Sequence, residues 1–344
     1  MASPNLLERL DQGPVICAEG YLFEIERRGY LQAGAFVPEV VLDNPHVVTE
    51  LHREFMHAGS DVIEAFTYYA NRDKLKIMGR EGDLEEINRT ALTLAKDVAA
   101  EGDALFAGNI CNTNIFLPDD ADSKKVARGM FEEQVGWAMD AGVDFIIAET
   151  ISFYEEALLA LEVIREAGAI SVVTLAVHRD GLRDDYTVPD ACQRLKDAGA
   201  DVVGMNCIRG PNTMLTELEK IAKTVKGPLA ALPVPYRTTP EEVNFQALTD
   251  SGCDCIPDRP FPTALEPLTC NRYEIAEFAK KALALGVNYQ GVCCGAGPHH
   301  IRAMAEALGK NPPASRYTAD MSKHYALGDH AQLVKENLAF AKEM

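Results

Sequence analysis

The 344-residue sequence has no stretch of about 18 consecutive apolar residues, the length that a membrane-spanning helix requires. Its first 14 residues have no basic region followed by an apolar core, as a secretory signal would. We therefore expect neither a membrane span nor export, and we expect a cytoplasmic location. Nine cysteines in such a chain indicate free thiols in a reducing compartment rather than a disulfide framework.

Positive charge is also scarce. The chain has 33 lysines and arginines against 52 aspartates and glutamates, a formal net charge of −19. Because so acidic a surface repels phosphate backbones, we expect no binding to nucleic acid. Low-complexity segments are missing, and no repeat goes beyond a strand–helix unit. With 47 % hydrophobic residues, the chain can still bury a large core, as one α/β barrel or two medium domains.

What the sequence does contain is a short apolar run followed by a helical pattern, repeated along the chain. The predicted strands are 15–20, 61–66, 104–109, 144–148, 171–177, 201–206, 229–234 and 288–292. A long helix is predicted over 84–100, because Ile87, Ala91, Leu94 and Val98 lie on one helical face. Gly142, Gly199 and Gly286 end the helices that precede three of the strands.

Strands of this kind alternating with helices predict a parallel sheet covered on both faces. Eight strand–helix units match a closed barrel, which usually takes about 250 residues plus insertions. An open doubly wound sheet is the alternative. Polar residues follow many strand ends, however, and only a barrel gathers all those ends at one mouth. We therefore predict a single (β/α)8 TIM barrel.

The barrel is expected to span residues 1–310. Residues 252–267, rich in proline, are expected to form an irregular loop over its mouth. Residues 311–344 form a short C-terminal extension, with a final helix at about 330–342. We expect that helix to pack on the barrel or on a partner chain.

Two adjacent cysteines, Cys293 and Cys294, end the eighth predicted strand and are followed by Gly295. Adjacent cysteines do not readily pair with each other, because the small ring strains the disulfide. Cys207 ends the sixth predicted strand, and strands six and eight are second neighbours in a barrel, with ends about 10 Å apart. Cysteine side chains can span that gap around one zinc ion. Three thiolates with an open fourth position are typical of catalytic zinc.

Two simpler interpretations of these thiols stay open. Free cysteine is often buried as a small apolar residue, and a vicinal pair could act as a redox dithiol. Cys253 and Cys255 also have a close C-x-C spacing, but no second half of a metal site follows nearby. We expect those two cysteines to be structural.

Several motifs resemble the zinc-dependent homocysteine S-methyltransferase family. They are Gly-Met-Asn-Cys at 204–207, Gly-Val-Cys-Cys-Gly at 291–295, Pro298 and His-Ile-Arg at 300–302. Collinear matches run from about Leu6 to Leu308 and include Phe-Thr-Tyr-Tyr at 66–69 and Ile-Ala-Glu at 147–149. The likeness is nearest to the betaine-using members of the family. It implies a (β/α)8 barrel with zinc on Cys207, Cys293 and Cys294, and homocysteine bound to that zinc through its sulfur.

The resemblance further implies a methyltransferase that moves a methyl group from betaine to homocysteine, giving methionine and dimethylglycine. Glu149 matches a glutamate that holds homocysteine, and Tyr69 matches a tyrosine near the zinc and the donor; both are taken as catalytic. The family's Asp-Gly-Gly reads Ala18-Glu19-Gly20 here. Glu19 and Gly20 are therefore candidates for binding the substrate amine, together with Glu149.

The methyl donor carries its methyl group on a cationic atom, which aromatic faces hold well, and Phe36, Tyr68 and Tyr69 are the candidates. Phe36 stands where the betaine enzymes have a tryptophan, and Thr150 where they have a tyrosine. Because the aromatic surround is thinner, a sulfonium donor such as S-methylmethionine, or another betaine, is the main alternative. A non-catalytic, zinc-stabilised binding protein is a weaker one. The C-terminal extension is shorter than the oligomerisation arm of the animal enzymes. A homo-oligomer therefore remains an open prediction, but the tetramer of those enzymes is not implied.

Overall fold

The computed structural model describes residues 4–250, 259–325, 327–328 and 335–343. Its strands pair in parallel, each with the next and β8 with β1, and close a barrel. The predicted (β/α)8 barrel is thus confirmed. The strands are β1 (Val15–Ala18), β2 (Val62–Glu64), β3 (Leu105–Cys111), β4 (Phe145–Ile151), β5 (Ser171–Leu175), β6 (Val202–Asn206), β7 (Leu229–Leu232) and β8 (Val287–Val292).

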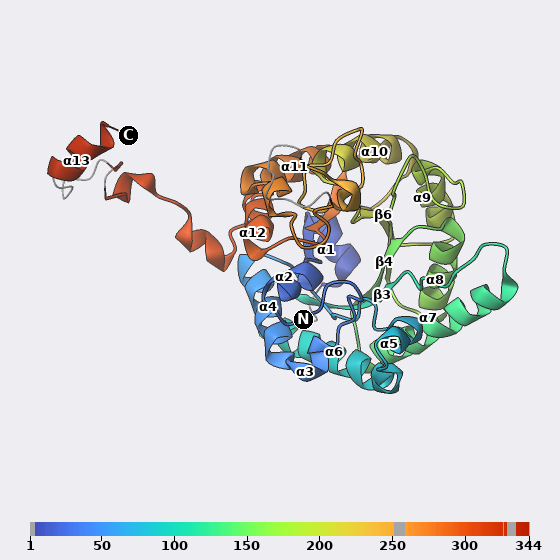
Figure 1. Ribbon diagram of the computed structural model, residues 1–344. Coiled ribbons are helices and arrows are strands. Elements are labelled where there is room, and N and C mark those ends of the chain that lie inside the picture. Colours follow the sequence, from blue (N-terminus) through green and yellow to red (C-terminus); the bar gives the residue numbers. More distant parts are fainter. Residues whose placement is uncertain (1–3, 251–258, 326, 329–334, 344) are drawn as a thin grey trace.

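Helices surround the barrel as a ring (Figure 1). None of the described helices is long and apolar enough to cross a membrane. The helices are α1 (Leu6–Gln12), α2 (Tyr21–Arg27), α3 (Val40–Asp43), α4 (Pro45–Ala58), α5 (Arg72–Ile77), α6 (Leu84–Ala99), α7 (Ala121–Ala141), α8 (Tyr154–Glu166), α9 (Val188–Asp197), α10 (Pro211–Thr224), α11 (Arg272–Ala284), α12 (Pro298–Ala307) and α13 (Lys335–Ala341). Short 3-10 helices are η1 (Glu81–Asp83), η2 (Phe245–Ala247), η3 (Glu266–Leu268), η4 (Pro313–Tyr317) and η5 (Met321–Lys323).

The predicted strands agree with the observed ones to within three residues at each end, and the largest difference is at the end of β4. Glu149 was expected just past the fourth strand, but β4 continues to Ile151, so Glu149 lies within it. The reason is a local irregularity. Thr150 has a left-handed backbone, with φ of 58°, and the register between β4 and β5 shifts there before pairing resumes at Ile151.

The inside of the barrel is apolar at one end and polar at the other. Side chains alternate inward and outward along a strand, and inward apolar residues from all eight strands form one buried cluster with Leu6 and Leu10 of α1. Helix α1 thus closes the amino-terminal end of the barrel. The same alternation, followed toward the carboxyl ends, leads to buried polar residues: Glu19, Glu64, Asn109, Glu149 and Asn206.

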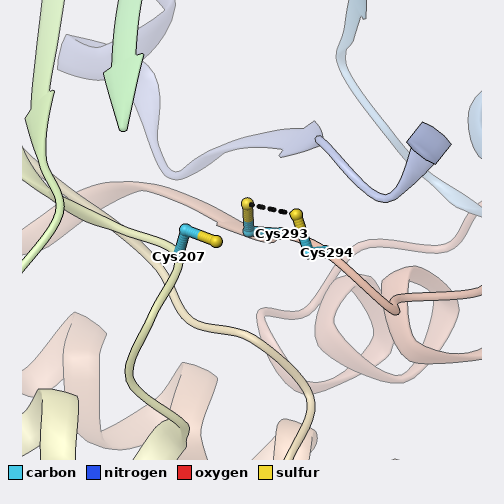
Figure 2. Close-up of side chains that lie close together, drawn as sticks. All are labelled: Cys207, Cys293 and Cys294. Atoms are coloured by element: carbon cyan, nitrogen blue, oxygen red, sulfur yellow. Dashed lines mark hydrogen bonds between the residues drawn. The ribbon is translucent and has the colours of Figure 1, made fainter. Parts of the chain in front are cut away.

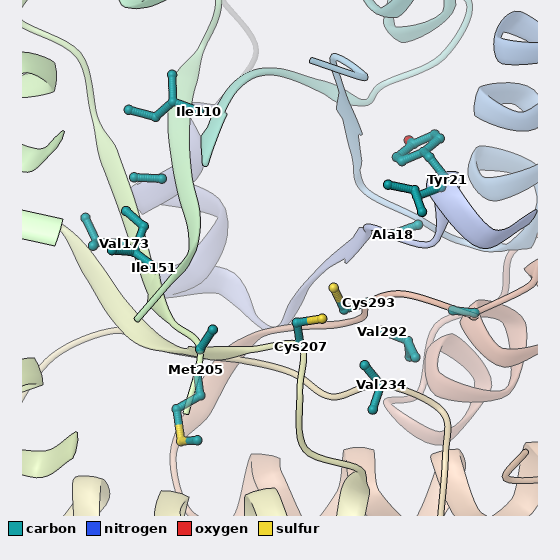
Figure 3. Close-up of a cluster of buried hydrophobic side chains, with 14 of the residues drawn as sticks. Ala18, Tyr21, Ile110, Ile151, Val173, Met205, Cys207, Val234, Val292 and Cys293 are labelled. Atoms are coloured by element: carbon teal, nitrogen blue, oxygen red, sulfur yellow. The ribbon is translucent and has the colours of Figure 1, made fainter. Parts of the chain in front are cut away.

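A second, larger cluster fills the space between the strands and the helices and reaches the barrel mouth. There it includes Cys207 and Cys293 (Figure 3). The predicted face of α6 contributes to it, with Ile87, Ala91 and Val98 fully buried. The predicted glycine stops are also found, since Gly142, Gly199 and Gly286 all have left-handed φ, at 79°, 99° and 86°.

Three aspartates placed just before even-numbered strands fasten neighbouring strands together. Each carboxylate accepts a hydrogen bond from a backbone N–H at the start of the preceding strand: Asp61 from Ile16 at 2.7 Å, Asp144 from Phe106 at 2.8 Å and Asp201 from Ser171 at 2.8 Å. Hydrogen bonds to a charged group are stronger than those between neutral groups. The aspartate before each of these strands therefore links two neighbouring strands in addition to its place in the turn. We call each such link an aspartate clasp.

The start of the C-terminal extension follows the barrel surface. Helix η4 packs beside α4 and α12, and Arg302 donates a hydrogen bond to Thr318 at 2.7 Å. Helix α13 lies apart from the barrel (Figure 1), and Asn337 in it donates to the carbonyl of Tyr325 in the same tail at 3.3 Å. Packing of the last helix on the barrel is therefore not borne out, and packing on a partner chain stays a prediction.

Two predicted features fall partly outside the described residues. The predicted mouth loop over 252–267 is described only from residue 259 onward, so nothing is placed for Cys253 and Cys255. The predicted start of the final helix, near residue 330, lies outside them as well.

Gly291 of β8 leaves no room for a larger residue. A Cβ atom there would lie 1.9 Å from the carbonyl oxygen of Cys17 and 2.5 Å from Leu232 Cδ2. Because the barrel must shift to accept it, we expect Gly291→Ala to lower the free energy of unfolding by about 1–3 kcal/mol, measured by urea denaturation.

Gly129→Ala is the matched control. Gly129 lies within α7, and nothing lies within 4 Å of an added Cβ. Since alanine favours a helix interior over glycine, this variant should gain about 0.5–1 kcal/mol. Equal destabilisation by the two substitutions would contradict the crowding of Gly291.

Candidate active site

Three thiols meet at the barrel mouth. Cys207 follows β6, Cys293 and Cys294 follow β8, and their Sγ atoms all lie within 4.8 Å of one another. The Sγ atoms of Cys293 and Cys294 are 3.8 Å apart, and Figure 2 shows the three side chains turned toward one another. Cys207 and Cys293 are buried and Cys294 is half-buried. The structure thus brings together the three cysteines that the sequence singled out.

The end of β7 holds the two cysteine segments in place. The backbone N–H of Cys207 donates to the carbonyl of Leu232 at 2.9 Å, and that of Cys293 donates to the carbonyl of Pro233, also at 2.9 Å. Strand β7 lies between β6 and β8 in the barrel. The carbonyl groups of its last residue, Leu232, and of Pro233 just after it therefore support both halves of the thiol cluster.

The backbone of several residues at the site is left-handed. Cys207 and Ile208 have φ of 56° and 61°, a conformation that is unfavourable for a β-branched residue such as isoleucine. The N–H of Phe245 donates to the carbonyl of Ile208 at 2.9 Å and helps to hold it. Phe36 and Tyr69 are also left-handed, with φ of 54° and 59°. Strained backbone of this kind gathers at functional sites.

The thiol cluster fits a soft divalent cation. Thiol hydrogen bonds from Cys293 and Cys294 lower the pKa of Cys207 well below its usual value, so its thiolate is favoured. Burial raises the pKa of Cys293, and contact with Cys207 raises that of Cys294. All three sulfurs could be thiolates together only with a positive charge among them, which a metal ion would supply.

A small inner cavity of about 20 Å³ lies beside the thiols. The carboxyl groups of Glu19, Glu64 and Glu149 and the amide of Asn109 line it, and each of these residues is at most 6 % exposed. Burial, with repulsion from Glu149, raises the pKa values of Glu19 and Glu64 well above the usual range for a carboxyl group. Burial raises the pKa of Glu149 to about 7.

Two asparagines orient these carboxyl groups. Asn206 Nδ2 donates to Glu149 Oε2 at 2.6 Å and to Glu19 Oε2 at 3.2 Å. Asn109 Nδ2 donates to Glu149 Oε1 at 2.7 Å and also to Glu64 Oε1. Within the described residues, Glu19 Oε1 and Asn109 Oδ1 are buried without a hydrogen-bond partner. Such orphaned acceptors are costly, and a ligand with N–H groups would satisfy them.

A larger outer cavity of about 320 Å³ also adjoins the thiols, since Cys207 and Cys294 are part of its lining. Its lining includes the rings of Phe36, Tyr68 and Tyr69 and the charged side chains of Glu156 and Arg183. Leu22, Tyr68 and Cys294 line both cavities. The thiol cluster therefore stands at the boundary between an acidic cavity and an aromatic one.

The ring of Tyr69 already has two neighbours. The centroid of the Tyr68 ring is 4.3 Å from that of Tyr69, and Lys74 Nζ lies 4.1 Å from the Tyr69 centroid. A cation thus already occupies one aromatic face of Tyr69. Phe36 packs against Phe23, with ring centroids 5.5 Å apart, and lines the outer cavity.

Gly20 has a different position from the other predicted residues. In the part of the chain that the structure describes, it is not among the residues that line either cavity. A Cβ atom at Gly20 would lie 2.3 Å from the carbonyl oxygen of Ala296. Its lack of a side chain therefore lets the end of β1 approach the loop that follows Cys294.

Sequence reasoning passed over Glu64 and Asn109 and left Asn206 out of the site. On the inward face of the barrel, Glu64 and Asn206 end otherwise apolar strands and Asn109 interrupts one. That interruption was a readable signal, because a buried charged residue needs a partner or a ligand. Arg183 lies in the loop after β5, where the sequence offered no comparable signal.

Comparisons with known proteins agree with the geometry. Residues 19–308 match the model of the homocysteine S-methyltransferase family. Over 329 residues, the chain is 38 % identical to betaine–homocysteine S-methyltransferase 1 from Xenopus tropicalis, covering 91 % of this chain and 79 % of that protein. It is also 38 % identical over 327 residues to S-methylmethionine–homocysteine S-methyltransferase from Pongo abelii, covering 91 % and 85 %.

The fold is similar to the crystal structure of the metallated form of the homocysteine methyltransferase MmuM from Escherichia coli. The TM-score is 0.67 at 20 % identity, and the match covers 87 % of this chain and 98 % of that one. The predicted family, and with it the methyltransferase class of enzyme, are confirmed. The chain belongs to the homocysteine S-methyltransferase family.

Proposed function

We propose that this protein is a zinc-dependent enzyme that transfers a methyl group from betaine to homocysteine, giving methionine and dimethylglycine. The supporting observation is the position of the three thiols between the acidic inner cavity and the aromatic outer cavity. Homocysteine carries a thiol and an ammonium group, and betaine carries a methylated, cationic nitrogen. The ammonium group of homocysteine thus matches the acidic cavity in charge, and the methylated nitrogen of betaine matches the aromatic cavity, because ring faces attract cations.

Cys207, Cys293 and Cys294 would hold the zinc ion. Tetrahedral zinc with Zn–S bonds of about 2.3 Å places its sulfur ligands about 3.8 Å apart, and the Sγ atoms of Cys293 and Cys294 are 3.8 Å apart. Three sulfur ligands favour zinc over magnesium or calcium and leave one position open. When bound, zinc would supply a Lewis acid that lowers the pKa of an incoming thiol.

The residues of the chain would align the two substrates. Glu149 and Glu19 would accept hydrogen bonds from the ammonium group of homocysteine, and Asn206 fixes both carboxylates. Tyr68 and Phe36 would hold the cationic methyl group, at about 0.5–2 kcal/mol for each aromatic face. The thiolate sulfur then forms a bond to the methyl carbon, and the C–N electron pair leaves with dimethylglycine. Tyr69 would contribute less to holding the cation, because Lys74 already occupies one face of its ring.

A sulfonium donor such as S-methylmethionine is the second candidate. Its amino acid part carries a carboxylate and an ammonium group, and the outer cavity contains Arg183 and Glu156, which could bind them. Arg183 lies over the ring of Phe153, with its guanidinium carbon 4.5 Å from the centroid. The relative from Pongo abelii is named for this donor.

A donor comparison tests the proposal. We expect zinc-loaded protein with homocysteine to form methionine from betaine, with a kcat/KM at least about tenfold higher than from S-methylmethionine, as measured by mass spectrometry. Methionine formed from S-methylmethionine but not from betaine would reject betaine and support the second candidate. No methionine from either donor would favour the binding-protein alternative.

The thiol cluster is tested by Cys294→Ala. Because one of three ligands is lost, we expect zinc content to fall well below one ion per chain. Methyl transfer should fall by more than about 100-fold, since a catalytic metal contributes several kcal/mol. The melting temperature should change little, because Cys294 is only half-buried.

Cys192→Ala is the control, since Cys192 is buried in α9, away from the thiol cluster. It should keep its zinc and its activity. An unfolded Cys294→Ala protein beside a folded control would point to a structural metal and against a catalytic one.

We also propose that the protein is cytoplasmic and that it forms a homo-oligomer. Three closely spaced free thiols suit a reducing compartment. The position of α13 apart from the barrel would suit contact with a second chain (Figure 1).

A further inference from the structure

Glu64 is a buried glutamate that the proposed mechanism has not yet used. It ends β2, is 3 % exposed and lines the inner cavity together with Glu19 and Glu149. Asn109 donates one hydrogen bond to Glu64 and another to Glu149, so the two carboxyl groups are held side by side. The thiol of Cys17 is its other neighbour, 3.9 Å from Glu64 Oε2.

The inner cavity gathers acidic side chains without a basic one to match them. Carboxylate oxygens of Glu19 and Glu64 lie within 4.8 Å of each other, and so do those of Glu19 and Glu149. Among the described residues, no lysine or arginine makes an ion pair with any of these three glutamates. Burying carboxylates together is costly unless a cation joins them. The arrangement therefore calls for a ligand that brings positive charge.

The size of the cavity limits what that cation can be. A volume of about 20 Å³ has room for one group the size of a water molecule. An ammonium group is of that size, and its three N–H bonds can each reach a different carboxylate. The unpartnered Glu19 Oε1 is one such acceptor. A hard metal ion suits the place less, because it needs about six oxygen ligands.

We propose that Glu64 is the third carboxylate for the ammonium group of the thiol substrate, and that it sets the preference for a thiol with an α-amino group. The inference rests on the proposed function, because it places the sulfur of that substrate at Cys207, Cys293 and Cys294. The cavity lies directly beside these thiols, since Cys293 and Cys294 also line it. One substrate can therefore reach the thiols with its sulfur and the three glutamates with its ammonium group.

The test compares two thiols that differ only in the amino group, L-homocysteine and 4-mercaptobutanoate. Dissociation constants are measured by calorimetry on zinc-loaded protein, and wild type should prefer homocysteine. In Glu64→Gln, affinity for homocysteine should fall about 10- to 100-fold, the usual effect of losing a hydrogen bond to a charged group. Affinity for 4-mercaptobutanoate should stay within about threefold.

Two further variants separate a binding role from a structural one. Glu64→Asp keeps the charge and should retain part of the preference, and it serves as the test if the glutamine variant does not fold. Glu217→Gln removes the charge of another buried glutamate, on α10, which pairs with Lys220 at 2.9 Å. That control should leave the preference for homocysteine unchanged.

Each outcome can be told apart from the others. If Glu64→Gln and Glu64→Asp weaken both thiols equally, Glu64 only supports the fold and the proposal is overturned. A wild-type protein that binds both thiols equally overturns the ammonium site while leaving the thiol cluster intact. If wild-type protein binds neither thiol, the proposed function itself fails, and the role of Glu64 fails with it.

Discussion

The end of β7 is the constraint on which the site depends. Leu232 and Pro233 offer two consecutive carbonyl groups, and each accepts the backbone N–H of one cysteine segment. Because proline has no N–H of its own, the chain at this point can accept hydrogen bonds more readily than it can donate them. The left-handed backbone of Cys207 costs about 1–3 kcal/mol, and these bonds help to hold it. Without them, the sulfur of Cys207 would have no fixed distance from the other two.

The electrostatics of the mouth follow from the same arrangement. Thiols and carboxyl groups lie together in a water-poor space, where like charges repel strongly and favour protonated forms. Cations therefore lower the energy of the site wherever they enter. A metal among the sulfurs, an ammonium group in the inner cavity and a methylated onium group in the outer cavity would each satisfy this need. The acidic chain as a whole adds to the attraction for positively charged ligands.

The barrel and its thiols could be predicted because their signals are local. Short apolar strands, glycine stops and cysteines at two strand ends can each be read within a few residues, and closure of the barrel then brings the ends together. Glu149 within β4 could not be read in the same way, since the shift at Thr150 depends on a left-handed backbone at a non-glycine residue. The same holds for Cys207 and Ile208, whose conformation is fixed by contacts with β7 and with Phe245.

Glu64 and Asn109 are intermediate between the residues that the sequence predicts and those that it does not. Their strands can be read as apolar runs, and the inward alternation along each run leads to the polar residue at its end. The position of α13 depends on tertiary contacts, or on their absence within the described tail, which no helical pattern encodes. Propensity and periodicity therefore predict the scaffold, while the orientation of its polar layer follows from packing between strands that are far apart in the sequence.

The aspartate clasps divide part of the barrel into pairs of strands. Each clasp joins an odd-numbered strand to the even-numbered strand after it, through Asp61, Asp144 and Asp201. A piece of the chain that ends at β2, β4 or β6 contains both partners of every clasp of its strands. One that stops after β1, β3 or β5 leaves a backbone N–H without its carboxylate. The clasps thus tie the strands of the first three quarters of the barrel together two by two, so each such pair carries a side-chain link that the joints between pairs lack.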